Sequence, residues 1–307
     1  MNKEKLYTNK VSIVVLATIC CILWGSAYPA IKVGYKLFNI ATDDTASKLV
    51  FAGYRFFLAG IIVLLYLLIT KNNIFVLNKK DLGKVTLLGI LQTTLQYTFF
   101  YIGLSYTTGV RGSILNGVGT FFSIILAHFI YRDDKLNFNK IVGCIIGFIG
   151  VIVVNISGGI GSEGVSFKGE GLIILAALML SISSIYSKRI TKSINSAIAT
   201  GYQLSIGGLI LLVAGLITGG NVKGFTVESL LLLIYMALIS SVAFVIWTQL
   251  IKYNKVGVIS VFNFLIPVFG TLLSGIFLGE NIFDIKILIS LFMVSFGIYF
   301  TYRNKNN

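Results

Sequence analysis

The chain alternates between long apolar runs and short polar connections. A helix needs about 20 apolar residues to cross a hydrocarbon layer of roughly 30 Å. Short connections make neighbouring helices antiparallel, and the runs are too long and continuous for barrel strands of about 10 alternating residues. The pattern predicts an all-α integral membrane protein with ten transmembrane helices, at about 11–34, 49–70, 85–104, 110–131, 139–156, 170–187, 197–219, 229–251, 256–279 and 284–302.

The first apolar run follows a basic segment, residues 1–10, and must be distinguished from a signal peptide. Its apolar part is longer than a signal core of about 7–15 residues. It also carries Trp24, Tyr28 and Lys32 at regular spacing, which a discarded segment would not need. We therefore predict a retained first helix.

Composition agrees with a membrane protein. Hydrophobic residues make up 56% of the 307 residues and charged residues only 12%, against roughly 25% charged in globular proteins. This excludes a disordered chain, a disulfide scaffold and an ordinary cytosolic domain. Cys20, Cys21 and Cys144 lie in apolar runs, so we expect buried thiols with no disulfide or metal role.

Charge gives the orientation. Lys and Arg number 25 and Asp and Glu 11, for a net charge of +14. The cations are scattered between apolar runs rather than gathered on one face, so nucleic acid is not the expected partner. With the N-terminus inside, 17 cations fall on the cytoplasmic side and 8 on the other side or in the outer half. The positive-inside rule then predicts a multi-pass protein of the cell membrane with both termini cytoplasmic.

The two halves of the chain repeat each other at an offset near 147 residues. Ser113 and Asn116 correspond to Ser260 and Asn263, with the same S-x-x-N spacing. The repeats are 11–156 and 170–302, with five predicted spans each. An odd number of spans turns the second repeat upside down relative to the first, which is a design of secondary transporters with a site near the midplane.

The chain resembles the drug/metabolite transporter superfamily, specifically EamA-type transporters with two EamA domains. The resemblance rests on W-G-S-A-Y-P-A-I-K at 24–32, Y-R-F-F-L-A-G at 54–60, Ser260, Asn263, Pro267 and L-G-E-N at 278–281. It implies a carrier that exports or exchanges amino acids or other small metabolites. The chain departs from the pattern at Thr120, where the second half has Pro267, and in a sixth helix without Trp. The identity of the substrate is therefore not inferred from relatives.

Polar side chains at membrane depth are the candidate site residues, because they are costly unless they face a partner or a wet cavity. Trp24, Tyr28 and Lys32 recur every four residues on the first helix and predict a polar stripe toward a central cavity. The alternative is an interfacial aromatic anchor with a snorkelling lysine.

Amides and aromatic residues on later helices complete the predicted substrate site. The paired Asn116 and Asn263 on repeat-related helices are suited to hydrogen-bonding a zwitterionic or hydroxylated solute. The alternative is interhelical hydrogen bonding, worth about 0.6 kcal/mol per bond. The remaining candidates are Gln92, Gln96, Tyr186 and Trp247.

Other intramembrane residues have structural interpretations beside functional ones. Pro267 lacks an N–H, so it predicts a kink near Asn263 that acts as a hinge or as static curvature. Arg55 and Arg111 are interpreted as headgroup or helix-end contacts, and His128 as a packed polar residue. The glycines at 143, 147 and 150 predict close helix contacts.

Absences narrow the function. No Asp or Glu falls well inside a predicted span, which disfavours a proton-driven exporter of lipophilic cations and favours neutral, zwitterionic or weakly anionic solutes. No catalytic residues, metal ligands, cofactor or ATP-binding loop are predicted. A receptor or scaffold and, less favoured, an intramembrane enzyme are the alternatives; coupling ion, direction and oligomeric state are left open.

Overall fold

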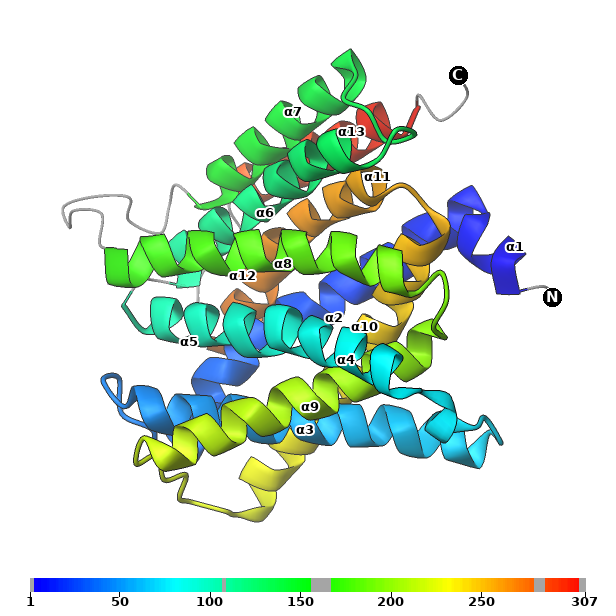
Figure 1. Ribbon diagram of the computed structural model, residues 1–307. Coiled ribbons are helices and arrows are strands. Elements are labelled where there is room, and N and C mark those ends of the chain that lie inside the picture. Colours follow the sequence, from blue (N-terminus) through cyan, green and yellow to red (C-terminus); the bar gives the residue numbers. More distant parts are fainter. Residues whose placement is uncertain (1–2, 107–108, 156–166, 279–284, 304–307) are drawn as a thin grey trace.

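The computed structural model describes residues 3–106, 109–155, 167–278 and 285–303, and every regular element in these ranges is helical (Figure 1). The α-helices are α1 (Lys3–Thr8), α2 (Lys10–Leu37), α3 (Thr45–Ile69), α4 (Lys79–Gly89), α5 (Gln96–Tyr106), α6 (Gly109–Ile130), α7 (Phe138–Asn155), α8 (Leu172–Ile190), α9 (Ser196–Ile217), α10 (Val227–Tyr253), α11 (Val256–Ser260), α12 (Leu265–Leu278) and α13 (Ile285–Arg303). The 3₁₀ segments are η1 (Ile74–Val76) and η5 (Val261–Phe264), and the π-helical segments are η2 (Ile90–Leu95) and η4 (Phe167–Gly171).

Six helical segments are long and apolar enough to cross a membrane by length and composition. Shorter apolar helices cover 115–130, 138–150 and 288–301. The expectation of an all-α protein with several membrane spans is confirmed for the described residues, while a count of ten crossings stays a prediction. The six segments are Lys10–Leu37, Thr45–Ile69, Phe167–Ile190, Ser196–Ile217, Val227–Tyr253 and Val256–Leu278.

Polar residues in the connections determine where several helices begin. The side chains of Asn9, Asp44, Asn78 and Asn195 accept hydrogen bonds from backbone N–H groups in the first turns of α2, α3, α4 and α9. Thr226 opens α10 with a reciprocal capping box. Such caps satisfy N–H groups that have no partner within the helix, so each apolar run starts beside a hydrophilic connection.

Helices from the two halves of the chain are interleaved. Helix α3 packs along α9, and α7 packs along α13. In the same way α2 packs against α10 and α12, while α8 packs against α5 and α6. In Figure 1, α3 and α9 lie together at the bottom and α7 and α13 at the top. The contacts between the halves therefore come in matched pairs.

Glycines allow the closest helix pairs to approach backbone to backbone. A Cβ placed on Gly60 of α3 would lie 2.3 Å from the backbone N of Ser205 in α9. On the other pair, a Cβ on Gly143 of α7 would lie 2.6 Å from the backbone O of Gly297 in α13. The predicted close contacts are present at Gly143, and small residues at helix interfaces are typical of membrane bundles.

Two breaks in regular α-helix lie near the middle of the bundle. Between α4 and α5, η2 forms a wide turn in which the N–H of Gln96 reaches the carbonyl of Leu91. Before α12, η5 tightens the chain just ahead of Pro267. Proline has no N–H for the carbonyl four residues earlier, which is that of Asn263. The irregularity expected near Asn263 is therefore present.

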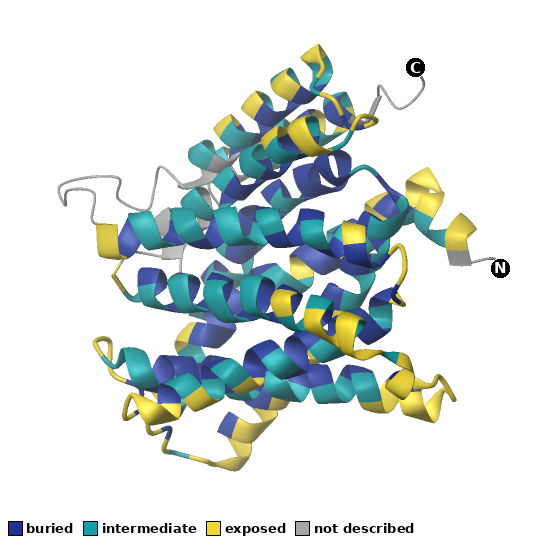
Figure 2. Ribbon diagram, viewed as in Figure 1, coloured by how far each residue is buried: buried dark blue, intermediate teal, exposed yellow. Residues whose placement is uncertain are grey.

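Burial is reversed relative to a soluble protein on much of the outer surface. Large hydrophobic residues such as Val213, Leu216, Leu231 and Phe292 are exposed on the outside of the bundle (Figure 2). Many serines, threonines and glutamines are buried inside it. An apolar exterior around buried polar groups is the arrangement expected in a lipid bilayer.

The two ends of the bundle differ in charge. Helix α1, the end of α13 and the connections 70–78, 131–137 and 191–195 lie at the right-hand end in Figure 1. These connections and the adjoining helix ends carry most of the cations counted on the predicted cytoplasmic side. The connections 38–44 and 218–226 lie at the opposite end. We refer below to the right-hand end as the basic end.

Candidate functional site

A central cavity collects residues from both halves of the chain. It includes six of the nine predicted substrate-site residues, on α2, α5, α6, α10 and η5. Their neighbours in the lining come from these helices and from α3, α8 and α12. The lining residues are Trp24, Ala27, Tyr28, Ile31, Arg55, Gln96, Tyr97, Phe100, Asn116, Leu180, Phe244, Trp247, Asn263 and Ile266.

The cavity is small in this conformation. It leaves about 60 Å³ for the centres of water-sized spheres, whereas one water needs roughly 10–15 Å³ by the same measure. By that measure the cavity holds roughly four to six waters.

Aromatic rings form one wall of the cavity. The rings of Trp24 and Trp247 meet edge to face with centroids 5.0 Å apart, and Trp24 meets Phe244 at 5.4 Å. Tyr28 meets Phe100 at 5.8 Å. Such contacts stabilise aromatic pairs by about 0.5–1.5 kcal/mol beyond burial, so the wall is a stable surface that links α2, α5 and α10.

Three polar atoms of the lining are enclosed and have no hydrogen-bond partner among the residues that the structure describes. They are Nε1 of Trp24, Oε1 of Gln96 and Oδ1 of Asn263. A buried polar atom without a partner costs about 1–3 kcal/mol, so an N–H donor and two amide acceptors in one cavity are suited to a polar solute.

Arg55 lines the same cavity, which differs from the favoured sequence interpretation of a headgroup contact. Its side chain is only 1% exposed. Nε donates to Oγ of Ser240 at 2.9 Å, and Nη1 donates to the Tyr101 hydroxyl at 3.3 Å. The guanidinium also lies 4.9 Å from the ring centre of Phe56. No carboxylate pairs with it among the residues that the structure describes.

The start of α3 explains why sequence reasoning underestimated Arg55. The predicted span began at residue 49, which put Arg55 about one turn inside the membrane. The helix begins at Thr45, so Arg55 lies about 15 Å along it at 1.5 Å per residue. The helix has 25 residues, so Arg55 lies near its middle. A cation at that depth with no acid in the spans is the signal that could have identified it.

Three predicted site residues do not line the cavity. Lys32 is exposed; each four-residue step turns a helix by about 40° beyond one full turn, so Lys32 is rotated by about 80° from Trp24. Gln92 is buried in η2 and is not among the residues that line the cavity. Tyr186 packs instead against a separate cluster that includes Val85 and Ile190.

The remaining predictions for intramembrane residues have mixed outcomes. Pro267 is buried in α12, next to Ile266 of the lining; its role as a hinge stays a prediction. The side chains of Arg111 and Ser113 lie outside the described residues. No group of three or more His, Cys, Asp or Glu side chains that could hold a metal occurs in the described part of the chain.

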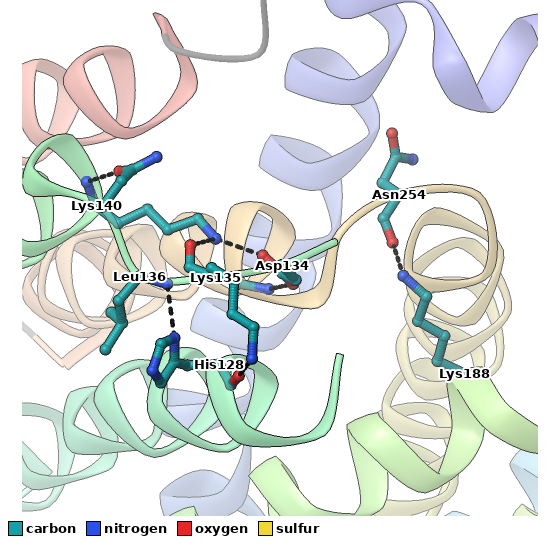
Figure 3. Close-up of polar contacts among 9 residues, drawn as sticks. His128, Asp134, Lys135, Leu136, Lys140, Lys188 and Asn254 are labelled. Atoms are coloured by element: carbon teal, nitrogen blue, oxygen red, sulfur yellow. Dashed lines mark hydrogen bonds and ion pairs between the residues drawn. The ribbon is translucent and has the colours of Figure 1, made fainter. Parts of the chain in front are cut away.

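An ionic cluster ties the halves together at the basic end (Figure 3). Asp134, between α6 and α7, accepts a hydrogen bond from Nζ of Lys140 at 2.5 Å. Its other oxygen accepts one from the backbone N–H of Gly257, in the first turn of α11, at 2.9 Å. Both ionic side chains are buried. A single carboxylate thus joins a connection in the first half to a helix start in the second.

Neighbouring contacts reinforce this end. Nζ of Lys188 donates to the backbone carbonyl of Asn254 at 2.6 Å and lies 5.0 Å from the ring centre of Tyr131. His128 accepts the backbone N–H of Leu136 on Nδ1 at 3.0 Å (Figure 3). The imidazole of His128 thus contacts the connection between α6 and α7, and its structural role stays a prediction.

The described helices surround a central cavity with polar side chains in its lining. The chain belongs to the EamA-like transporter family, whose model matches residues 11–156 and 167–303. The expected membership of the drug/metabolite transporter superfamily, with two EamA domains, is confirmed.

Relatives with the same extent carry transporter names. An "Uncharacterized transporter" of Clostridium kluyveri is 25% identical over 81% of each chain. The "Uncharacterized transporter YetK" of Bacillus subtilis is 25% identical over 83% of this chain and 78% of its own. The "WAT1-related protein At3g28100" of Arabidopsis thaliana is 23% identical over 88% and 86%. A solved structure titled "Crystal structure of protein" shares the fold, with a TM-score of 0.77 at 15% identity over 96% of this chain and 98% of its own.

Proposed function

We propose that the protein is a secondary transporter that moves a small metabolite through the central cavity by alternating access. The observation that carries the proposal is the set of enclosed, unpartnered polar atoms on Trp24, Gln96 and Asn263. Buried polar groups are usually hydrogen-bonded, so three unpartnered atoms in the lining of one cavity make it suited to a polar solute. A solute that passes through the cavity supplies the missing partners and then leaves.

The architecture supports two inverted five-helix repeats that cross the membrane ten times. The matched helix pairs, α3 with α9 and α7 with α13, are what a twofold relation between the halves produces. Inverted repeats supply two related conformations, one open to each side, around a site at their interface. The proposed repeat boundaries remain 11–156 and 170–302.

The proposed substrate is a neutral, zwitterionic or weakly anionic metabolite such as an amino acid. Amide oxygens of Gln96 and Asn263 are suited to ammonium or hydroxyl groups, and the aromatic wall is suited to a hydrocarbon portion. The transporter family supports a small-molecule substrate. We propose export or exchange as the direction, because the resemblance to EamA-type carriers implies it.

The orientation follows from charge. The basic end carries α1 and the end of α13, and cations favour the cytoplasmic side. We therefore propose a protein of the cell membrane with both termini cytoplasmic. On this orientation, the Asp134 cluster lies at the cytoplasmic end of the bundle and joins the two halves there. Single cysteines placed at Asn72 and Asn221, on opposite ends, would be labelled by an impermeant maleimide from opposite sides of intact cells.

Flux in liposomes tests the transport proposal. Purified protein is reconstituted with a mixture of isotope-labelled amino acids inside, and efflux is measured by mass spectrometry with and without unlabelled amino acids outside. We expect saturable efflux that is reduced at least about tenfold in Asn116→Ala, Asn263→Ala or Trp247→Ala, since a hydrogen bond to a charged group is worth about 1.5–3 kcal/mol.

The matched control is Asn72→Ala, the same substitution on an exposed residue outside the cavity. It should transport like the wild type. Normal flux in all three cavity variants, each expressed and folded, would remove the cavity from the transport path. Absence of flux for a broad set of metabolites would count against a carrier.

A further inference from the structure

We propose that Arg55 is the anion-binding residue of the central cavity and that the transported solute carries a carboxylate. This inference rests on the proposed transport function and specifies the substrate of the same cavity. The starting observation is that the buried guanidinium of Arg55 has no carboxylate partner among the residues that the structure describes.

A buried arginine remains protonated and therefore positively charged. Its pKa is too high for deprotonation inside a protein, and burial of an uncompensated ion is strongly unfavourable. Arg55 is 1% exposed and its recorded partners, Ser240, Tyr101 and Phe56, are all uncharged. The negative charge that balances it must therefore come from outside the described chain, and the cavity is the space that the residue lines.

The contacts of Arg55 position its side chain but leave some of its N–H donors without an acceptor among the described residues. Oγ of Ser240 donates to the carbonyl of Met236 at 2.9 Å, so its lone pair is available to accept from Nε of Arg55. The Tyr101 hydroxyl accepts from Nη1. A guanidinium has five donors, so three have no hydrogen-bond acceptor among the described residues. Donors fixed in a planar fork match the two oxygens of a carboxylate.

The other polar lining residues offer a hydrogen-bond donor to one end of a solute and acceptors to the other end. The N–H of Trp24 is a second free donor for an anion. Oε1 of Gln96 and Oδ1 of Asn263 are free acceptors for a cationic or hydroxyl group. One cation, one donor and two acceptors around a small cavity are complementary to a compact carboxylate that also bears an ammonium or hydroxyl group.

A lipid phosphate would offer the same anionic chemistry. The cavity argues against it, because Arg55 lies about 15 Å along α3 by helix geometry and is enclosed by rings such as Tyr97 and Phe100. A headgroup would have to leave the bilayer surface to reach it. We therefore commit to a soluble carboxylate and include an anionic lipid as a competitor in the test.

Intrinsic fluorescence provides a binding assay that needs no transport. The chain has two tryptophans, Trp24 and Trp247, and both line the cavity. Purified protein in detergent is titrated with propionate and, separately, with propionamide, a neutral compound of nearly the same shape. We expect propionate to change the emission saturably and propionamide to bind at least about tenfold more weakly, as for loss of a charge-assisted contact.

Variants assign the charge preference to Arg55. Arg55→Gln should abolish the difference between propionate and propionamide, and Arg55→Lys should retain part of it. Ser240→Ala leaves the guanidinium in place but removes one positioning contact, so it should weaken propionate binding less than Arg55→Gln does. The matched control is Lys32→Gln, which removes one positive charge from an exposed site outside the cavity and should behave like the wild type.

Several results would overturn the inference. They are equal responses to propionate and propionamide in the wild type, an unchanged preference in Arg55→Gln, or an emission change caused by dioctanoyl phosphatidylglycerol but not by propionate. Failure here is distinguishable from failure of the transport proposal. Amino-acid flux without a carboxylate preference would leave a carrier with another substrate class, whereas propionate binding without any flux would leave an anion site in a protein that is not a carrier.

Discussion

Two buried cations of this protein have opposite surroundings. Lys140, at the basic end, is 5% exposed and lies 2.5 Å from a carboxylate oxygen of Asp134. Arg55, in the central cavity, is 1% exposed and contacts a serine hydroxyl, a tyrosine hydroxyl and a phenylalanine ring. Of these two cations, Lys140 is paired with an acid, whereas Arg55 has neutral partners in the described structure.

The difference separates a structural charge from a binding charge. Asp134 and Lys140 satisfy each other, and Asp134 also receives the N–H of Gly257, so the ions contribute to closing one end of the bundle. A permanent acid beside Arg55 would compete with an anionic solute for the same donors. Because no such acid lies beside Arg55 among the described residues, its donors stay available to a solute, but the empty site is energetically less favourable.

The largest effect should follow from breaking the paired charge. Asp134→Ala leaves Lys140 buried without its acid and the first turn of α11 without an acceptor. Removal of one partner of a buried pair costs about 3–5 kcal/mol, so we expect a clearly lower melting temperature in detergent, measured by light scattering or tryptophan emission.

The double variant Asp134→Leu with Lys140→Met tests whether an orphaned charge causes that loss. It removes both ions and should recover a substantial part of the melting temperature. If the single and double variants are equally destabilised, the contact to Gly257 rather than the ion pair dominates.

The unpaired cation should respond in the opposite way. Arg55→Met leaves no acid without a partner, so the stability of the empty protein should change by no more than about 1 kcal/mol or should rise. Carboxylate transport should fall at least about tenfold, because a charge-assisted contact is lost. Melting temperature and liposome flux of the same preparation check both statements; a stability loss as large as that of Asp134→Ala would make Arg55 a structural residue.

A smaller effect is expected for a cation with neutral partners outside the cavity lining. Lys188 donates to the carbonyl of Asn254 and lies over Tyr131. Lys188→Met keeps most of the apolar stem, so the cost should be about 1 kcal/mol, a typical net hydrogen-bond contribution. The measurement is the shift in melting temperature at high and low salt. Normal carboxylate binding in this variant would separate it from Arg55.

The smallest effect should come from the exposed cation of the first spanning helix. Lys32 lies outside the cavity lining, so Lys32→Gln should leave both melting temperature and propionate binding unchanged within error. A loss of carboxylate binding comparable with that of Arg55→Gln would restore the prediction of a polar stripe that ends at Lys32.

Much of the fold was predictable because the bilayer imposes a simple rule. Apolar runs of sufficient length must become helices that satisfy their own backbone groups, and polar caps such as Asn9 and Thr226 mark where helices begin. The family resemblance was likewise visible in local motifs. Six of the nine candidate residues line one cavity, because polar side chains in apolar runs seek the interior of the bundle.

Only the packed bundle decided which of those polar residues share a space. Helix periodicity gives the face on which a side chain lies but not the neighbour that this face meets. Thus Lys32 is exposed, Gln92 is buried away from the cavity lining, and Arg55 lines the same cavity as Trp24 and Trp247. An α-helix turns by 100° and rises by about 1.5 Å per residue. Small differences in where a helix begins or how wide its turns are therefore change which side chains meet when the helices pack together.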